Sequence, residues 1–134
     1  MTRIILAYIV SAIVFFGLDM VWLTTMVDRF YRPRMGALLL ERPNLAVAGL
    51  FYAVYLAGMQ YFAVLPALRD GGWTQALLSG ALLGGLAYAT YDLTNLSTIR
   101  GFPASVAVVD IIWGMLATGV SAAVTTAVVR ALGR

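Results

Sequence analysis

Cysteine, histidine and lysine are all absent from this chain of 134 residues. Without cysteine or histidine the chain cannot form disulfides, hold haem or an Fe–S cluster through those side chains, use a catalytic thiol or build the usual zinc sites. We therefore expect no metal and no cofactor. A serine–histidine pair is also excluded, so acid–base chemistry is the only enzymatic route that the composition leaves open.

Charged residues are scarce as well. They make up 11% of the chain, against 62% hydrophobic residues, whereas about a quarter of the residues in a soluble domain are charged. All the basic residues are arginines, and they flank the apolar runs. The net charge of +3 therefore indicates anchoring at a membrane surface rather than nucleic-acid binding.

Four apolar runs cover residues 4–27, 45–65, 75–96 and 104–129. Each is near or above the roughly 20 residues that a helix needs to cross a bilayer. The sequence therefore predicts one all-α domain over residues 1–134, an integral membrane four-helix bundle with multiple passes. We expect the first run to be kept as a span, because it is too long for a signal peptide and contains Asp19.

The longest connection, residues 28–44, is basic and amphipathic, and Arg34–Leu40 is predicted to form a short helix on the membrane surface. Asn44 is a predicted N-cap for the second helix. Small residues occur at helical spacing in the last two runs, at Gly80 and Gly84 and again at Gly114 and Thr118. Such faces allow close helix contact within or between chains, and we expect a homo-oligomer.

One polar stretch, residues 88–100, departs from this composition. Tyr88, Asp92 and Asn95 lie at positions i, i+4 and i+7, so they share a helical face. A carboxylate facing hydrocarbon costs roughly 2.5 kcal/mol or more. This face should therefore turn inward, and Asp92, which has the most polar neighbours on its face, should be the acid most sensitive to substitution.

Three carboxylates are predicted to lie at one depth. Asp19, Asp92 and Asp110 fall roughly 12, 6 and 9 Å inside the ends of their runs at 1.5 Å per residue. In a four-span chain these ends all belong to one leaflet. Three acids in one bundle cannot all stay ionised in a low dielectric without cations, so at least one should exchange a proton or bind a cation.

Aromatic side chains accompany these acids, because Trp22 and Trp113 each follow an aspartate by one helical turn. Two alternatives remain: the aromatic residues belong to an interfacial belt, or single carboxylates have only a structural role. The predicted ligand-binding residues are Asp19, Trp22, Tyr52, Tyr55, Tyr88, Asp92, Asn95, Asp110 and Trp113. Tyr31, Arg32 and Arg100 are predicted at the mouth of the pocket.

The segment YATYDLTNLSTIRG, together with Asp19-x-x-Trp22, Phe30-Tyr31-Arg32 and Asp110-Ile-Ile-Trp113-Gly114, resembles a family of small bacterial membrane proteins known as domain of unknown function 2177. The resemblance extends over nearly the whole chain and implies an inner-membrane protein, with no activity attached. Residues 19–25 also resemble residues 92–98. Two duplicated helical hairpins would explain this internal similarity, and chance similarity between apolar helices would explain it too.

Three functions fit these features. The first is binding or transport of a small cationic, aromatic or lipidic ligand, coupled to protonation of an aspartate. The second is an acid–base enzyme acting on a lipid or isoprenoid chain, which would need a lateral opening between helices. The third is an accessory subunit whose polar face binds a partner helix. We expect membrane lipid and a hydrophobic or cationic small molecule as partners, and no nucleic acid.

Overall fold

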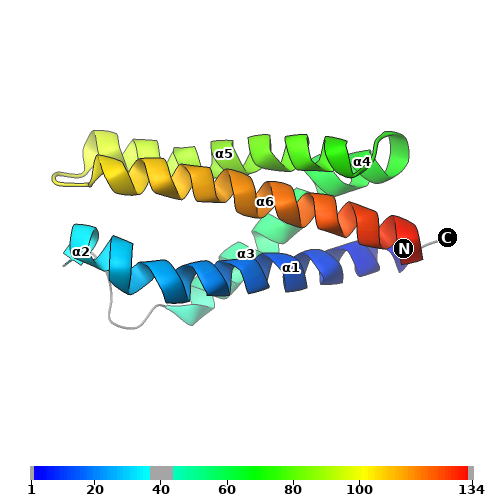
Figure 1. Cartoon of the computed structure of the whole chain (residues 1–134), viewed down its shortest axis with the longest axis horizontal. Coiled ribbons are helices and arrows are strands. Elements are labelled where there is room, and N and C mark those ends of the chain that lie inside the picture. The colour runs from blue at the N-terminus through cyan, green and yellow to red at the C-terminus, as the bar shows by residue number, and fades with distance from the viewer. Residues whose placement is uncertain (1, 37–43, 133–134) are drawn as a thin grey trace.

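A computed structural model describes residues 2–36 and 44–132. Within these ranges the chain is helical and contains no strand. The first helical rod consists of α1 (Thr2–Met26), the π-helical turn η1 (Val27–Tyr31) and α2 (Arg32–Met35). The second consists of α3 (Leu45–Met59), the π-helical turn η3 (Gln60–Val64) and α4 (Leu65–Asp70). Two long helices follow, α5 (Trp73–Thr98) and α6 (Ala104–Leu132) (Figure 1). The fold is the all-α membrane bundle that the sequence predicts.

The first rod is longer than predicted. The sequence analysis begins a loop at residue 28, but the backbone stays helical to Met35 through the π-helical turn. The physical reason is tertiary packing: Tyr31 is buried in a cluster with Phe102 and Val106, and Met35 packs against it. Of the predicted surface helix Arg34–Leu40, residues 37–40 lie outside the described residues.

The second rod starts as predicted and ends later. The Asn44 side chain accepts a hydrogen bond from the Val47 amide at 3.2 Å, so the predicted N-cap is confirmed. The rod then continues past residue 65, through Pro66, to Asp70. Pro66 has no N–H to donate within the helix. The π-helical turn Gln60–Val64 ends two residues before it, so the helical backbone hydrogen bonds are altered at this point of the rod.

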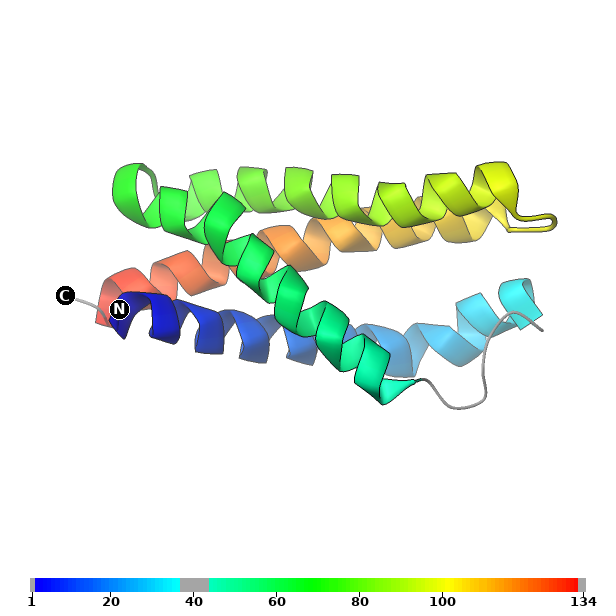
Figure 2. The ribbon, with the colours of Figure 1, turned by 180° about the vertical axis from the view of Figure 1, so that it is seen from behind.

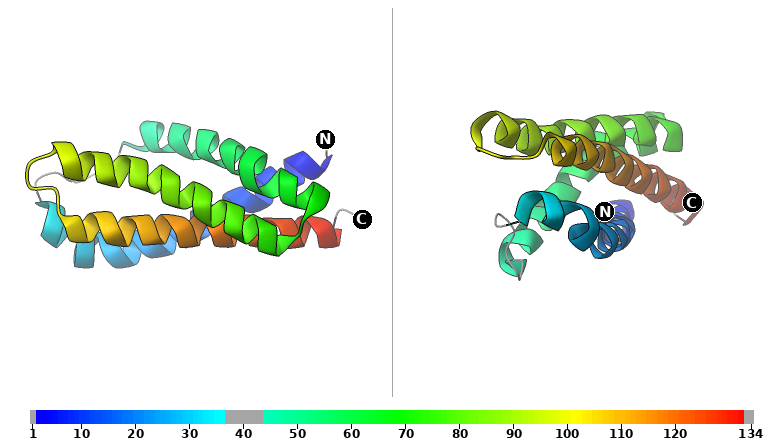
Figure 3. Two further views of the ribbon diagram at one scale, coloured as in Figure 1. Left: turned by 90° about the horizontal axis from the view of Figure 1, so that it is seen from above. Right: turned by 60° about the vertical axis from the view of Figure 1, so that its left-hand side comes forward.

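Helices α5 and α6 form an antiparallel hairpin with very close backbones (Figure 3). A Cβ atom built on Gly80 would lie 2.8 Å from the Thr118 carbonyl oxygen and 2.9 Å from Gly119 Cα. A Cβ on Gly84 would lie 2.8 Å from Thr118 Cβ. The small-residue faces therefore pack against each other inside the chain. The homo-oligomer remains a prediction that draws no support from these faces.

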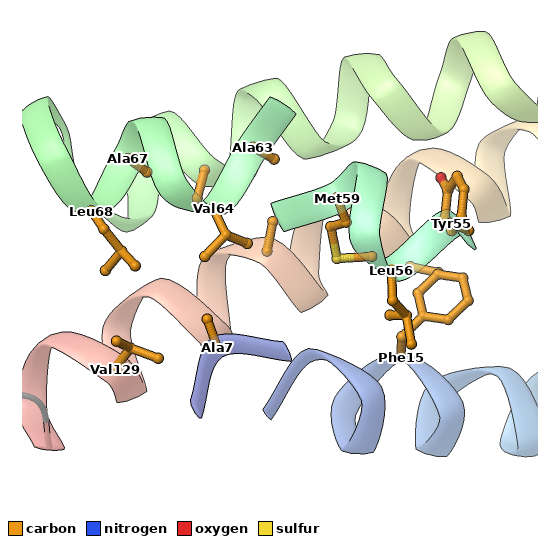
Figure 4. Packing of buried hydrophobic residues seen from close by; sticks show 13 residues of the cluster. Ala7, Phe15, Tyr55, Leu56, Met59, Ala63, Val64, Ala67, Leu68 and Val129 are labelled. Atoms are coloured by element: carbon orange, nitrogen blue, oxygen red, sulfur yellow. The ribbon is translucent and has the colours of Figure 1, made fainter. Parts of the chain in front are cut away.

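Helix α3 crosses the bundle obliquely instead of lying parallel to its neighbours (Figure 2). The first two rods therefore cross at an angle, whereas α5 and α6 lie close along their length. The duplication of a helical hairpin remains a hypothesis. The main core lies in the half that contains the chain termini (Figure 4). Phe15, Met59, Val64 and Val129 are all fully buried there.

Three helical rods are long and apolar enough to cross a membrane: Thr2–Met35, Leu45–Asp70 and Ala104–Leu132. Helix α5 has 26 residues, which correspond to about 39 Å at 1.5 Å per residue, and it runs alongside α6 (Figure 3). Helix α5 is not one of these three rods, because the polar stretch in its second half lowers its mean hydropathy. Leu78, Leu82 and Leu86 on α5 are exposed, as expected for a face in contact with lipid. Four spans therefore remain the prediction.

The close contact between α5 and α6 predicts an asymmetry between two glycine substitutions. Gly84→Ala should destabilise the protein by roughly 1–3 kcal/mol, because the new methyl group overlaps the α6 backbone. Gly58→Ala is the matched control, since a Cβ there meets nothing within 4 Å and alanine favours the helix. Thermal unfolding in detergent measures both. Equal melting temperatures would contradict the close packing.

Both ends of the described chain lie at the same end of the bundle (Figure 1). Arg29, Arg32, Arg34, Arg42 and Arg100 belong to the first and third connections, and four arginines belong to the opposite side. The excess of positive charge predicts that the first and third connections are cytoplasmic. A reporter fused after Arg134 should therefore be active outside the cytoplasm. Activity only in the cytoplasm would reverse this orientation.

Candidate functional site

A cavity of about 300 Å³ lies in the half of the bundle away from the termini. Residues of α1, η1, α2, α3, α5 and α6 form its wall. The wall contains all three predicted carboxylates and no basic residue. It is lined by Asp19, Trp22, Leu23, Val27, Tyr31, Met35, Tyr52, Tyr88, Tyr91, Asp92, Val106, Asp110 and Trp113.

Asp19 connects the first two rods. It is buried on α1, and its Oδ2 accepts a hydrogen bond from the Tyr52 hydroxyl on α3. The Tyr52 ring also packs edge-on against Phe15 and Phe16. This contact holds α3 against α1 where the two rods cross.

Asp110 connects the π-helical turn to the last helix. Its Oδ1 accepts a hydrogen bond from the Tyr31 hydroxyl at 2.8 Å, and the Tyr31 hydroxyl accepts one from Trp22 Nε1 at 3.0 Å. The three side chains come from α1, η1 and α6. The two bonds therefore join α1, η1 and α6 at the cavity wall.

The two predicted tryptophans lie face to face. The rings of Trp22 and Trp113 stack with centroids 4.4 Å apart and planes 6° from parallel. They come from α1 and α6, which antiparallel packing brings together. Each indole uses one face in the stack, and both rings belong to the wall that contains the acids. An outer indole face is the surface on which a cation can bind.

Asp92 differs from the other two acids. Its side chain is completely buried, and no N–H or hydroxyl group of the described residues donates a hydrogen bond to it. The nearest polar side chain is the carboxyl group of Asp110, which lies within hydrogen-bonding reach and can share a proton with it. The Trp113 indole N–H is directed towards Asp19 in the same wall. A buried carboxylate without a donor is costly. Asp92 has no accessible surface in this structure, so a ligand can contact it only after side chains of the wall move.

Several predicted residues lie outside the wall. Tyr55 does not line the cavity, and its hydroxyl shares a 2.7 Å hydrogen bond with the Thr118 hydroxyl. Asn95 is half-buried and does not line the cavity. At the predicted mouth, Tyr31 belongs to the wall itself, whereas Arg32 is bound to Asp28 at 3.0 Å and Arg100 is exposed at the α5–α6 turn.

Five residues of the wall were not predicted from the sequence: Leu23, Val27, Met35, Tyr91 and Val106. Tyr91 follows Tyr88 by three residues, so helical spacing places it next to the predicted face. Met35 lies in the segment Arg34–Leu40 that was predicted as a helix on the membrane surface, so no sequence signal pointed to the cavity. The position of Met35 follows from the helical extension through η1.

Two apolar crevices adjoin the cavity. One, of about 500 Å³, separates α1 from α3 and shares Tyr52 with the cavity wall. The other, of about 220 Å³, is lined by Phe51 of α3, by Ala87, Tyr88 and Tyr91 of α5, and by Asp110 of α6. The second crevice shares Tyr88, Tyr91 and Asp110 with the cavity, so one of the three acids, Asp110, also lines the side of the bundle.

Metal ligation has little support in this wall. In residues 2–36 and 44–132 no group of three acidic, histidine or cysteine side chains is arranged to hold a metal ion. The donors near the acids are tyrosine hydroxyls and indole N–H groups, which suit hydrogen bonding and aromatic contact. The arrangement can therefore bind an organic cation, or give and take a proton.

A family described as "Predicted membrane protein (DUF2177)" has a model that matches residues 4–127. The chain belongs to this family. The match includes every residue of the cavity wall and all but the ends of α1 and α6. Neither the curated proteins nor the solved structures contain a match. Membership of DUF2177 establishes a membrane protein, and function must be argued from the cavity.

The hydrogen bonds of the three acids predict opposite effects on stability. Asp92→Leu should leave the melting temperature unchanged or raise it, because no N–H or hydroxyl donor loses its acceptor and a costly buried carboxyl group is removed. Asp110→Leu should destabilise the protein by about 1–3 kcal/mol, because the Tyr31 hydroxyl loses its acceptor. Thermal unfolding in detergent compares the two variants. Equal destabilisation would show that Asp92 has a structural partner.

Proposed function

We propose that this DUF2177 protein binds an amphiphilic organic cation, with the charged group against the carboxylates and the apolar part in a lateral crevice. The single observation that carries the proposal is Asp92, a fully buried carboxyl group without an N–H or hydroxyl donor among the described residues. It lies in a wall with two further acids and no base. Ionisable groups inside membrane proteins are usually functional.

Charge and aromaticity support a cationic ligand. Asp19 and Asp110 each accept a hydrogen bond from a tyrosine, which leaves Asp92 to balance the ligand charge. The stacked pair of Trp22 and Trp113 offers aromatic surface in the same wall. Carboxylate and aromatic faces together favour an ammonium or phosphonium group over a metal ion.

The crevices support an amphiphile over a small polar cation. The crevice between α3 and α5 opens beside Tyr88, Tyr91 and Asp110, which also line the cavity. A ligand that partitions into the bilayer could therefore enter sideways, with its apolar part against Phe51 and Ala87. The cavity itself, with a volume of about 300 Å³, would hold the charged group.

Binding is favoured over transport by the closed half of the bundle. Beyond the cavity, Phe15, Met59 and Val64 are fully buried, and the α5–α6 backbones are in direct contact at Gly80. A path to the other leaflet would require these helices to separate. Binding of a cation at Asp92 would release any proton held there, so acid should weaken binding.

An acid–base enzyme acting on a lipid or isoprenoid chain is the second candidate, and the lateral crevice between α3 and α5 is the observation that favours it. Asp92 in its protonated form would then donate a proton to the chain. A bound molecule whose mass changes on incubation with the protein, measured by native mass spectrometry, would support the enzyme over the binding protein. The accessory-subunit hypothesis needs an outward polar face, and Asp92 is buried inside the chain.

Tryptophan fluorescence provides a direct test. The chain has three tryptophans, and Trp73→Phe leaves only the stacked pair in the cavity wall. Titration of this variant with tetraphenylphosphonium should quench or shift the emission. Adding Asp92→Asn should weaken binding by about tenfold or more, because the charge that pairs with the cation is lost while the shape is kept.

Asp70→Asn is the matched control for this titration. It makes the same change of charge at an exposed residue, at the end of α4 on the far side of the bundle. Its affinity for tetraphenylphosphonium should equal that of the parent. If Asp92→Asn binds the cation as tightly as Asp70→Asn does, the proposed function fails.

A further inference from the structure

We infer that a second site, at the opposite end of the bundle, binds the headgroup of an anionic phospholipid through Arg3 and Arg69. The two arginines line one cavity of about 360 Å³. They come from the first turn of α1 and from α4, which lie far apart in the sequence. The rest of the wall is Ile4, Tyr61, Leu65 and Leu68, and no acidic residue belongs to it.

Neither arginine forms an ion pair within residues 2–36 and 44–132, whereas Arg32 at the other end is paired with Asp28. Asp70 directly follows Arg69 but forms no ion pair with it. Both arginines are exposed and free to bind an anion. Guanidinium groups bind phosphate oxygens with two parallel hydrogen bonds, so a phosphate group is the matching anion.

Arg130, at the same end of the bundle, connects two helices. Its Nη2 donates hydrogen bonds to the carbonyl oxygens of Ala67 at 3.1 Å and Leu68 at 3.4 Å. These are carbonyl groups of α4, and the bonds tie α4 to α6. Arg130 therefore fixes the helix that carries Arg69, and it leaves the phosphate to Arg3 and Arg69.

The position and the apolar wall point to a lipid rather than to free phosphate. The start of α1 and the end of α4 are ends of two helical rods that are long and apolar enough to cross a membrane, and the ends of such spans lie at the depth of the lipid headgroups. Tyr61 and Phe62 are exposed and pack edge to face, with centroids 4.9 Å apart. With Leu65 they offer an apolar surface along which acyl chains can lie.

The site should prefer anionic over zwitterionic lipids. A headgroup that carries its own cation would bring positive charge close to two arginines, and the wall has no acid to receive it. This inference is independent of the proposed cation binding, because the two cavities share no residue. Failure of one leaves the other standing.

Native mass spectrometry in mild detergent, with added phosphatidylglycerol or phosphatidylcholine, tests the site. The parent protein should retain phosphatidylglycerol in preference. The double variant Arg3→Ala/Arg69→Ala should bind it roughly 30-fold more weakly, as expected for the loss of two surface arginines. The matched control Arg29→Ala/Arg100→Ala removes the same charge at the opposite end and should retain the lipid like the parent.

Three results would overturn the inference. Equal loss of lipid in both double variants would show that net charge alone attracts it. Equal retention of phosphatidylcholine and phosphatidylglycerol would remove the role of the arginines. Displacement of the lipid by millimolar inorganic phosphate would assign the site to a free anion. Melting temperatures of both double variants check folding, and Arg3→Lys/Arg69→Lys, which keeps the charge, should recover part of the affinity.

Discussion

The constraint on which this structure depends is that three carboxyl groups on helices of a membrane bundle must be kept out of hydrocarbon. Asp19, Asp92 and Asp110 all line one internal cavity. Two of them are bound by tyrosines from other elements, Tyr52 and Tyr31. These bonds connect α1 to α3 and η1 to α6, so the solvation of the acids also determines how the helices are joined in this half of the molecule. Burying a carboxyl group without such a partner is costly, and only Asp92 is in that position.

The two halves of the bundle differ because α3 is oblique (Figure 2). Near the termini, side chains as small as glycine let α5 and α6 touch, and Phe15, Met59 and Val64 fill the remaining space. In the other half α3 diverges from α5, and the resulting crevice reaches Asp110. The close contact of α5 and α6 continues to Gly114 and Tyr88, so one wall of the cavity is held by the same packing.

Charge is also divided between the two ends. The internal cavity is acidic and bordered by stacked indoles, whereas the cavity between α1 and α4 is basic and bordered by leucine and tyrosine. The acidic cavity is deep, so its ligand must leave water or lipid to enter it. The basic cavity lies at the helix ends, where lipid phosphates are already present. This division of charge is the reason why we propose different ligands for the two cavities, an amphiphilic cation and an anionic lipid.

The sequence by itself determined what depends on neighbouring residues. Apolar length gave the helices, Asn44 marked the start of α3, and helical spacing placed three acids at one depth, where the cavity is found. Contacts between distant segments were decided only by the tertiary structure. Burial of Tyr31 against Phe102 carried the first rod through a π-helical turn, where local signals predicted a loop. Helix rotation and crossing also stack Trp22 on Trp113. They leave Arg32 and Arg100 outside the cavity wall. They leave Asp92 without an N–H or hydroxyl donor. Spacing along one helix fixes which residues share a face, but the angle between helices fixes which faces meet.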